Sequence, residues 1–371
     1  MSSDRLPCFK ARRLLDGYYE KVLRNWFISE LQISNLEECK KPKYKLLNYD
    51  EINRKTPEEQ KKFVAGHYFW YFYPHCYKII RGLKKIKDDL DGKELFNNLK
   101  PSGNEHSCVY IVDIGAGLLT GLFSYCGFLL DTFEGELPNN YNCKILYVAN
   151  ESNSHQAKLY QNHTKDIQNY ISKVTNEKIE VHIEHIQTLF PDSVSQIKEI
   201  LEKQKESVKE LIILNACILK WLSGQFSLER YEKLFFYPDR IYLLFVEPGK
   251  DTEDYELIIN RLNKIQNFYQ DKIDIIKLYP QSQEKKLSYW YYNNPYMNFG
   301  IPIKQDEFRF LYVYLTNLTY KFFTAQKLQE AYYKTRLNII TSPFYDKIDL
   351  ILFDQNLEKE TERMAKNYKA R

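Results

Sequence analysis

The sequence predicts an α/β protein in which a mostly parallel sheet of about seven strands follows a helical amino-terminal domain. Two observations lead to this prediction. Beyond about residue 106, short apolar runs alternate with amphipathic segments, which is the pattern of parallel strands joined by crossover helices. The first hundred residues instead have apolar positions at helical spacing, interrupted by polar loops.

Two helical stretches are predicted in the amino-terminal part. The first runs from Arg12 to Leu31, on apolar residues three and four apart. The second runs from Pro57 to about Lys87 and opens with a proline and two glutamates, which suit the first turn of a helix. Pro74 should kink or break this helix, because proline lacks the N–H that the helix needs.

The strands and helices of the sheet are predicted from short apolar runs and from the segments between them. The candidate strands are Val109–Asp113, Lys144–Ala149, Glu180–His185, Glu210–Leu214, Arg240–Val246, Lys272–Leu278 and Phe308–Thr316. The candidate helices between the first five strands are Leu118–Leu130, Ser154–Lys173, Ser193–Lys205 and Ser227–Phe236. The last two strands are separated by an irregular stretch, so five parallel units are expected to precede a two-strand addition.

The most linker-like segment is Asn97–His106, which is rich in Asn, Pro, Gly and Ser. It divides the chain into a helical domain at residues 1–100 and a sheet domain at residues 101–320, followed by an extension at residues 321–371. The helical domain has 21 Lys and Arg against 14 Asp and Glu, whereas the remainder has 32 against 35. This asymmetry permits a basic face that meets phosphates.

A basic strip follows the second helical stretch, at Arg81, Lys84, Lys85 and Lys87. Such a strip is usually a solvated helix face, and the less common alternative is contact with the phosphates of RNA. An RNA partner bound through the amino-terminal domain therefore remains one of two interpretations.

Seven scattered cysteines, with no CxxC pair, predict neither a disulfide framework nor a zinc site. His182 and His185 lie three apart on a candidate strand, so their side chains should point to opposite faces and share no metal. No apolar run approaches the length that spans a bilayer. A cytoplasmic protein without metal and without a membrane segment is expected.

A glycine turn follows the first candidate strand, in the sequence VYIVDIGAGLLTG at residues 109–121. Asp113 ends the strand, and Gly115 and Gly117 form a tight turn before an apolar helix. Glycine suits this position because the backbone must turn sharply and approach a ligand without a Cβ. The amino terminus of the helix adds free N–H groups, and open α/β sheets bind nucleotides at this edge.

With an acid two residues before the first glycine, DIGAG resembles the first motif of class I S-adenosylmethionine-dependent methyltransferases. The resemblance implies a Rossmann-like sheet and a turn that wraps the methionine end of the cofactor. Gly115 and Gly117 would then cradle S-adenosylmethionine, and Asp113 would orient its amino-acid end. The family usually has a small residue two after the second glycine, whereas Leu119 stands here, where it could crowd the cofactor.

Two further segments bear on the same resemblance. The second strand ends in ILYVANES, which places Asn150 and Glu151 where the family uses an acid to hold both ribose hydroxyls. Glu151 is the better candidate for holding the ribose. The alternative interpretation is that this segment only caps the next helix, with Ser152 or Ser154 as the N-cap residue. The fourth strand supplies Asn215 at the same edge, as a further candidate for cofactor binding.

A narrower resemblance covers roughly residues 60–316. A Tyr-rich helix, then DIGAG, then LFVEPG and the final strand DEFRFLYVYL occur in the order of the methyltransferase-like family associated with the small ribosomal subunit. That family commonly carries cysteines that bind an iron–sulfur cluster between the last segments. Residues 250–316 contain no cysteine, so no iron–sulfur cluster is expected.

Three functions follow from these resemblances. The first is a S-adenosylmethionine-dependent methyltransferase with RNA as one candidate acceptor, for which no general base is identified. The second is a catalytically inactive, methyltransferase-like scaffold on ribosomal RNA or protein. The third is a small-molecule methyltransferase with the helical domain as a lid. The oligomeric state is left open.

Overall fold

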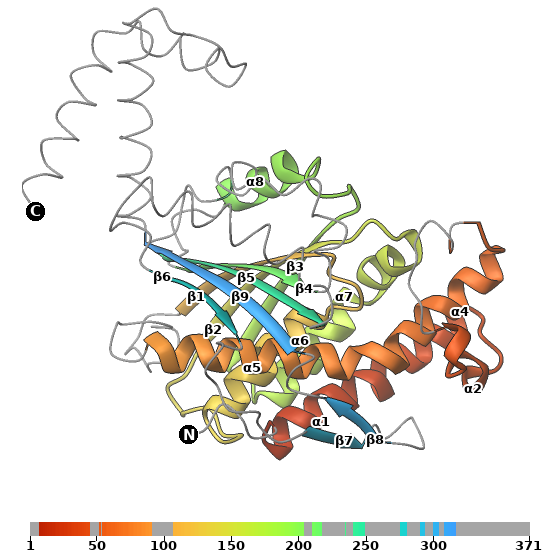
Figure 1. The fold of residues 1–371 in the computed structure, drawn as a ribbon, viewed down its shortest axis with the longest axis horizontal. Coiled ribbons are helices and arrows are strands. Elements are labelled where there is room, and N and C mark those ends of the chain that lie inside the picture. Colours follow the sequence, from red (N-terminus) through yellow and green to blue (C-terminus); the bar gives the residue numbers. More distant parts are fainter. Residues whose placement is uncertain are drawn as a thin grey trace, which may run out of the picture.

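The structure of the 371-residue chain is a computed structural model (Figure 1). It describes residues 7–44, 52, 54–90, 107–203, 210–216, 234, 240–248, 275–279, 290–293, 300–303 and 308–316. Within these ranges, no helix is both long enough and apolar enough to cross a membrane. The cytoplasmic location stays a prediction.

A seven-stranded sheet lies at the centre of the molecule, in the order β3-β2-β1-β4-β5-β9-β6. Its strands are β1 (Ser107–Ile114), β2 (Cys143–Asn150), β3 (Ile179–Ile186), β4 (Glu210–Ala216), β5 (Arg240–Pro248), β6 (Ile275–Tyr279) and β9 (Phe308–Thr316). From β3 to β5 all neighbours pair in parallel, whereas β9 pairs antiparallel with both β5 and β6. The α/β prediction is thus confirmed, with a parallel part of five strands and two strands added by antiparallel pairing.

The central strands are buried on both faces, as their nearly continuous apolar sequences require. Val109 and Ile111 of β1 belong to the large core cluster, together with residues of the amino-terminal helices. The alternate residues Tyr110 and Val112 are equally buried but lie outside that cluster, on the opposite face. The sheet therefore separates two apolar layers.

Three helices follow the first three strands, close to the predicted positions. They are α6 (Thr120–Thr132), α7 (Ser154–Val174) and α8 (Val194–Glu202). In Figure 1, α8 lies on one side of the sheet and α6 on the other. The predicted helix Ser227–Phe236 lies outside the described residues, apart from Leu234.

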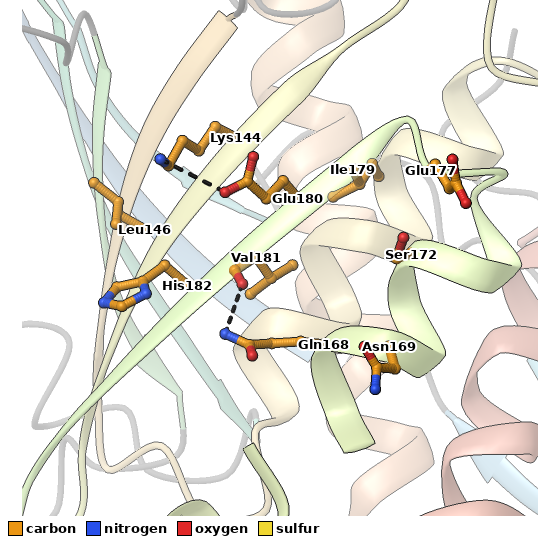
Figure 2. A pocket seen from close by; sticks show the side chains of 10 residues that line it. All are labelled: Lys144, Leu146, Gln168, Asn169, Ser172, Glu177, Ile179, Glu180, Val181 and His182. Carbon is orange, nitrogen blue, oxygen red and sulfur yellow. Dashed lines mark hydrogen bonds and ion pairs between the residues drawn. The ribbon is translucent and has the colours of Figure 1, made fainter. Parts of the chain in front are cut away.

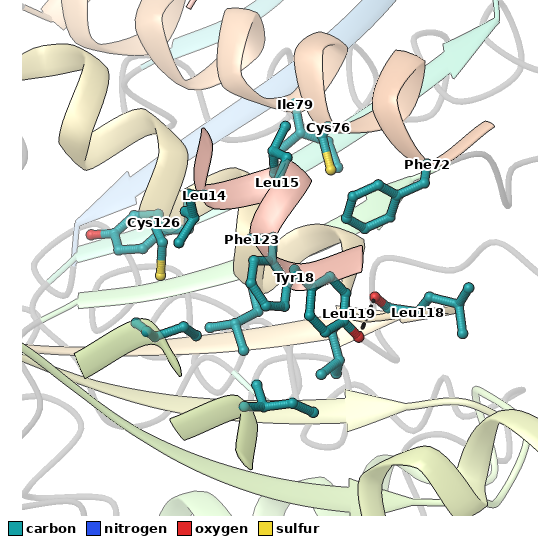
Figure 3. Close-up of a cluster of buried hydrophobic side chains, with 14 of the residues drawn as sticks. Leu14, Leu15, Tyr18, Phe72, Cys76, Ile79, Leu118, Leu119, Phe123 and Cys126 are labelled. Atoms are coloured by element: carbon teal, nitrogen blue, oxygen red, sulfur yellow. Dashed lines mark hydrogen bonds between the residues drawn. The ribbon is translucent and has the colours of Figure 1, made fainter. Parts of the chain in front are cut away.

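Two of the four amino-terminal α-helices that the structure describes pack directly on α6. The four helices are α1 (Phe9–Tyr18), α2 (Leu36–Cys39), α4 (Pro57–His67) and α5 (Tyr73–Leu90), and of these α1 and α5 contact α6. Figure 3 shows the contact, where Tyr18 stacks on Phe123 with ring centroids 3.7 Å apart. The hydroxyl of Tyr18 also donates to the C=O of Leu118 at 3.3 Å. The helices and one face of the sheet thus share one core.

The predicted helix over Arg12–Leu31 continues beyond α1 as two π-helical segments, η1 (Tyr19–Leu23) and η2 (Trp26–Glu30). A third π-helical segment, η4 (Tyr68–Phe72), lies between α4 and α5, directly before Pro74. The ordinary helical hydrogen bond cannot form at a proline nitrogen, and a wider turn accommodates this loss. The interruption expected at Pro74 therefore takes the form of a π-helical turn.

Some elements differ from the prediction. The stretch Lys40–Thr56 is predicted as a polar loop, but it contains the 3₁₀ turn η3 (Pro42–Tyr44), and the short helix α2 lies directly before it. The stretch predicted as irregular contains a two-stranded antiparallel sheet of β7 (Trp290–Asn293) and β8 (Gly300–Ile303). The segment Asn97–His106, where the domain boundary is predicted, lies outside the described residues, so the domain division stays a prediction.

Candidate functional site

A tight turn after β1 brings Gly115 and Gly117 to the carboxyl edge of the sheet. Both have left-handed backbones, with φ of 73° and 54°. Gly115 is exposed and Gly117 is partly exposed. A Cβ added at Gly117 would enter open space, because the nearest atom beyond its two chain neighbours is the carbonyl oxygen of Gly115, at 3.9 Å. The turn therefore leaves room for a ligand to approach its backbone.

The side chain of Glu151 reaches this turn from the end of β2. One carboxylate oxygen accepts the N–H of Gly117 at 3.0 Å, and the other accepts the N–H of Asn153 at 2.8 Å. Glu151 is only 4% exposed, and burial raises the pKa of its carboxyl group, while the N–H groups around it lower that pKa. The structure thus brings together the two predicted segments, with a carboxylate held between them.

Asn150 holds the glycine turn through its backbone carbonyl. Its C=O accepts the N–H groups of Gly115 at 2.9 Å and Ala116 at 3.2 Å, which fixes the start of the turn. Its side-chain amide donates instead to the C=O groups of Ile186 and Thr188, at 3.2 and 2.6 Å. The side-chain amide therefore makes hydrogen bonds within the protein, and its contact with a cofactor stays a prediction.

Asp113 is turned into the protein, where it is 1% exposed. Its carboxylate accepts the N–H of Gly121 at 3.1 Å and the hydroxyl of Tyr147, so it fixes the first turn of α6 to the sheet. Burial raises the pKa of Asp113 to about 6, although these hydrogen bonds lower it. In the described structure this carboxylate holds the first turn of α6, and its role in orienting the cofactor stays a prediction.

Leu119 occupies the position where the resemblance leads one to expect a small residue. It has a left-handed backbone with φ of 59° and is completely buried in the core (Figure 3). Its side chain therefore packs in the core, and its effect on a bound cofactor stays a prediction. Burial of a leucine, about 1.5–3 kcal/mol, offsets the roughly 1–2 kcal/mol that a left-handed backbone costs.

Asn215 lies in β4, beside Ile114 of β1 in the sheet register. It is fully buried, and its amide donates to the C=O of Leu244 at 3.4 Å. It therefore lies one residue below the glycine turn in the register, and its described hydrogen bond is made within the sheet.

Three residues of this edge were missed by the sequence analysis. The hydroxyl of Tyr160, from α7, donates to the C=O of Gly117. His185, from the end of β3, has its Nε2 3.4 Å from the C=O of Glu151. Leu189, next to the Thr188 that Asn150 contacts, is 62% exposed. No local sequence pattern marks a tyrosine in the middle of a helix as a site residue. His185 could have been found, because it lies at the carboxyl end of a predicted strand.

The basic strip predicted at the end of the second helical stretch is not a solvated face. Arg81 and Lys84 are only 7% and 8% exposed, because α5 packs on α6 along this side. The ammonium of Lys84 lies 2.7 Å from the carboxylate of Asp131, which is itself fully buried. The interpretation of this strip as an RNA-binding face is therefore corrected for these two residues.

A separate cavity of about 610 Å³ lies along the edge strand β3 and the end of α7 (Figure 2). Its lining includes the ion pair of Lys144 and Glu180, with 3.6 Å between the charged atoms, and His182. None of the predicted site residues lines it. Among the described residues, no group of three or more His, Cys, Asp or Glu side chains is placed to bind a metal ion.

No family model matches the chain, and no curated protein matches its sequence. Among solved structures, EvdMO1 is similar at 12% identity over 57% of this chain and 38% of its own, with a TM-score of 0.25. The 16S rRNA methylase ArmA is similar at 13% identity over 76% of this chain and 98% of its own, with a TM-score of 0.27. The chain thus spans less than half of EvdMO1. Similarities at these TM-scores carry no argument about function.

Proposed function

We propose that the protein is a S-adenosylmethionine-dependent methyltransferase whose cofactor binds at the carboxyl ends of β1 and β2. The observation that carries the proposal is the open space above Gly117 with the Glu151 carboxylate beside it. The sheet supports it, because the DIGAG resemblance implies a Rossmann-like sheet and the strands from β3 to β5 pair in parallel. Open α/β sheets bind ligands at this edge.

The residues present suit this cofactor. The backbone of Gly115 and Gly117 would face its amino-acid end, and the Glu151 carboxylate would accept hydrogen bonds from the ribose hydroxyls. The exposed side chain of Leu189 adds apolar surface at the same edge, which suits a planar base. Bound S-adenosylmethionine supplies a methyl group on a positively charged sulfur, so the chain's own task is to place the acceptor in line with it.

RNA is the acceptor that we propose. Burial lowers the pKa of His155, and the nearby charges of Lys158 and Lys61 lower it further, so two cations lie beside the start of α7. This end of α7 follows Glu151 directly, and a helix amino terminus also favours anions. Lys158 is exposed, whereas Lys61 pairs with Glu58 at 4.0 Å. These two lysines are the residues near the proposed cofactor site that the phosphates of a nucleic acid would meet.

Calorimetry with S-adenosylmethionine tests the cofactor site. Gly117→Val should abolish binding, because its branched side chain would fill the open space and oppose a φ of 54°. Gly135→Val is the matched control, since Gly135 also has a positive φ, of 93°, and lies before β2 at the opposite end of that strand. Equal affinity for the wild type and Gly117→Val would overturn the assignment, and no binding to the wild type would favour the inactive scaffold.

Filter binding of single-stranded RNA at several salt concentrations tests the acceptor. Replacing Lys61 and Lys158 with Ala should weaken binding and lower the salt slope by about 0.7 for each lost contact. Lys10 and Lys144, which are 51% and 43% exposed and pair with Glu136 and Glu180, form the control pair. Unchanged RNA binding in the first variant would favour a small-molecule acceptor.

A further inference from the structure

We propose that Tyr160 is a positioning residue that holds the glycine turn in the shape that receives the cofactor. This inference rests on the proposed function, and it concerns a residue of α7 that no sequence motif singles out. Tyr160 is 2% exposed, so its hydroxyl has little contact with solvent.

Gly117 is held from both sides. Its N–H donates to the carboxylate of Glu151 at 3.0 Å, and its C=O accepts the hydroxyl of Tyr160. The residue has a left-handed backbone and belongs to neither β1 nor α6, so the regular hydrogen bonds of those elements do not fix it. The side chains of Glu151 and Tyr160 therefore supply the restraint that the backbone lacks.

His185 supports the same clamp from β3. Its ring lies against the ring of Tyr160, with centroids 4.7 Å apart and planes inclined by 48°. Its Nε2 is 3.4 Å from the C=O of Glu151. Burial lowers the pKa of His185, which favours the neutral ring in this contact. Glu151, directly after β2, and Tyr160 of α7 thus contact Gly117. His185 of β3 contacts both of these residues.

A clamp of this kind acts on affinity through preorganisation. A turn that is already held in its bound shape loses less conformational freedom when a ligand arrives. Removing the Tyr160 hydroxyl should therefore release the Gly117 carbonyl, while the open space above the turn and the Glu151 carboxylate both remain. The loss would appear as weaker cofactor binding.

The test compares Tyr160→Phe with Tyr170→Phe. Tyr170 belongs to the same helix, and its hydroxyl also donates to a backbone C=O, that of Leu14, at 2.8 Å. The two substitutions therefore remove the same group from the same helix, but only one of them contacts the glycine turn. Calorimetry would give the affinity for S-adenosylmethionine, and amide hydrogen exchange of residues 115–121 would report the turn in the ligand-free protein.

We expect Tyr160→Phe to weaken binding about threefold to tenfold, which corresponds to one hydrogen bond, and to speed exchange in the turn. Tyr170→Phe should do neither, even where it lowers the melting temperature as much. Equal affinities for Tyr160→Phe and the wild type, or the same loss in both variants, would overturn the inference. If the wild type binds no cofactor, the proposed function fails, and faster exchange in Tyr160→Phe alone would still support the clamp, whereas unchanged exchange would refute it.

Discussion

At the scale of single residues, the packing of the start of α6 depends on Gly121, which has no side chain. A Cβ at Gly121 would lie 2.2 Å from the Asp113 carboxylate oxygen and 2.8 Å from a methyl carbon of Leu214. Both neighbours are buried, and Asp113 is held by the N–H of Gly121 itself. The glycine at this position therefore allows α6 to approach the sheet closely enough for the Asp113 carboxylate to bind its first turn.

Gly121→Ala should destabilise the protein by at least about 1–3 kcal/mol, since overpacking of this size displaces a buried carboxylate. Gly127→Ala in the same helix should be close to neutral. Its Cβ would meet only the end of the Ile80 side chain, at 3.0 Å, and alanine favours helix by about 1 kcal/mol. Urea denaturation of both variants measures the difference, and equal stabilities would contradict the account.

Asp113 should also make stability depend on pH. Burial raises its pKa from the ordinary 3.8 to about 6, so between these pH values the folded protein binds a proton that the unfolded chain has lost. The stabilising contribution of Asp113 to the free energy of unfolding is therefore fully present below about pH 4. It is lost as the pH rises through about 6, and the loss is up to about 3 kcal/mol. Denaturation at pH 4, 5, 6 and 7 should show a smaller fall in Asp113→Asn than in the wild type, since the raised pKa of Glu151 still contributes in both. Parallel curves would refute the role of Asp113.

At the scale of elements, a buried ion pair joins α5 to α6. The carboxylate of Asp131, at the end of α6, accepts the N–H of Cys8 at 2.6 Å as well as the ammonium of Lys84 at 2.7 Å. The Asp131 carboxylate of α6 therefore links its own helix to α5 and to the segment before α1, which are far apart in the sequence. A charge as deeply buried as Asp131 is costly without its partner, so the two helices depend on one another.

Lys84→Met should destabilise the protein by about 3–5 kcal/mol, because it leaves the Asp131 charge buried and uncompensated. Lys87→Met, at a partly exposed position of the same helix, should change stability by less than about 0.5 kcal/mol. Thermal unfolding followed by circular dichroism provides the comparison. Similar melting temperatures for the two variants would show that the ion pair is not needed.

At the scale of the whole molecule, the amino-terminal helices and the sheet share a single apolar core. Every residue of α6 from Gly121 to Asp131 is buried, because α1 and α5 cover the side that the sheet does not. A helix that is apolar on all sides cannot face water. The amino-terminal part is therefore needed for the stability of the sheet.

A fragment of residues 101–371 should consequently fail to fold alone, because the apolar surface of α6 would be exposed to water. Co-expression with residues 1–100 should restore a soluble complex that unfolds in one transition. Near-ultraviolet circular dichroism and size-exclusion chromatography distinguish the two cases. A separate fragment with native-like spectra and cooperative unfolding would instead favour independent domains.

Local patterns in the sequence were sufficient for much of the architecture. The boundaries of β9 at Phe308–Thr316 agree with the predicted strand, and α7 begins at the predicted Ser154. The glycine turn and Glu151 were also predicted as neighbours, and they lie in hydrogen-bond contact. These features depend on periodicity and on residues next to strand ends, which are properties of short segments.

The sequence by itself thus determined the order of strands and helices, the position of the turn and the carboxylate beside it. Only the tertiary structure decided that Leu119 and Asp113 point inward, that Lys84 is paired and buried, and that Tyr160 reaches Gly117. The physical reason is that a side chain's direction and burial depend on which distant segments cover it. α5 covers the basic strip, and α7 carries Tyr160 to a turn 43 residues away in the sequence.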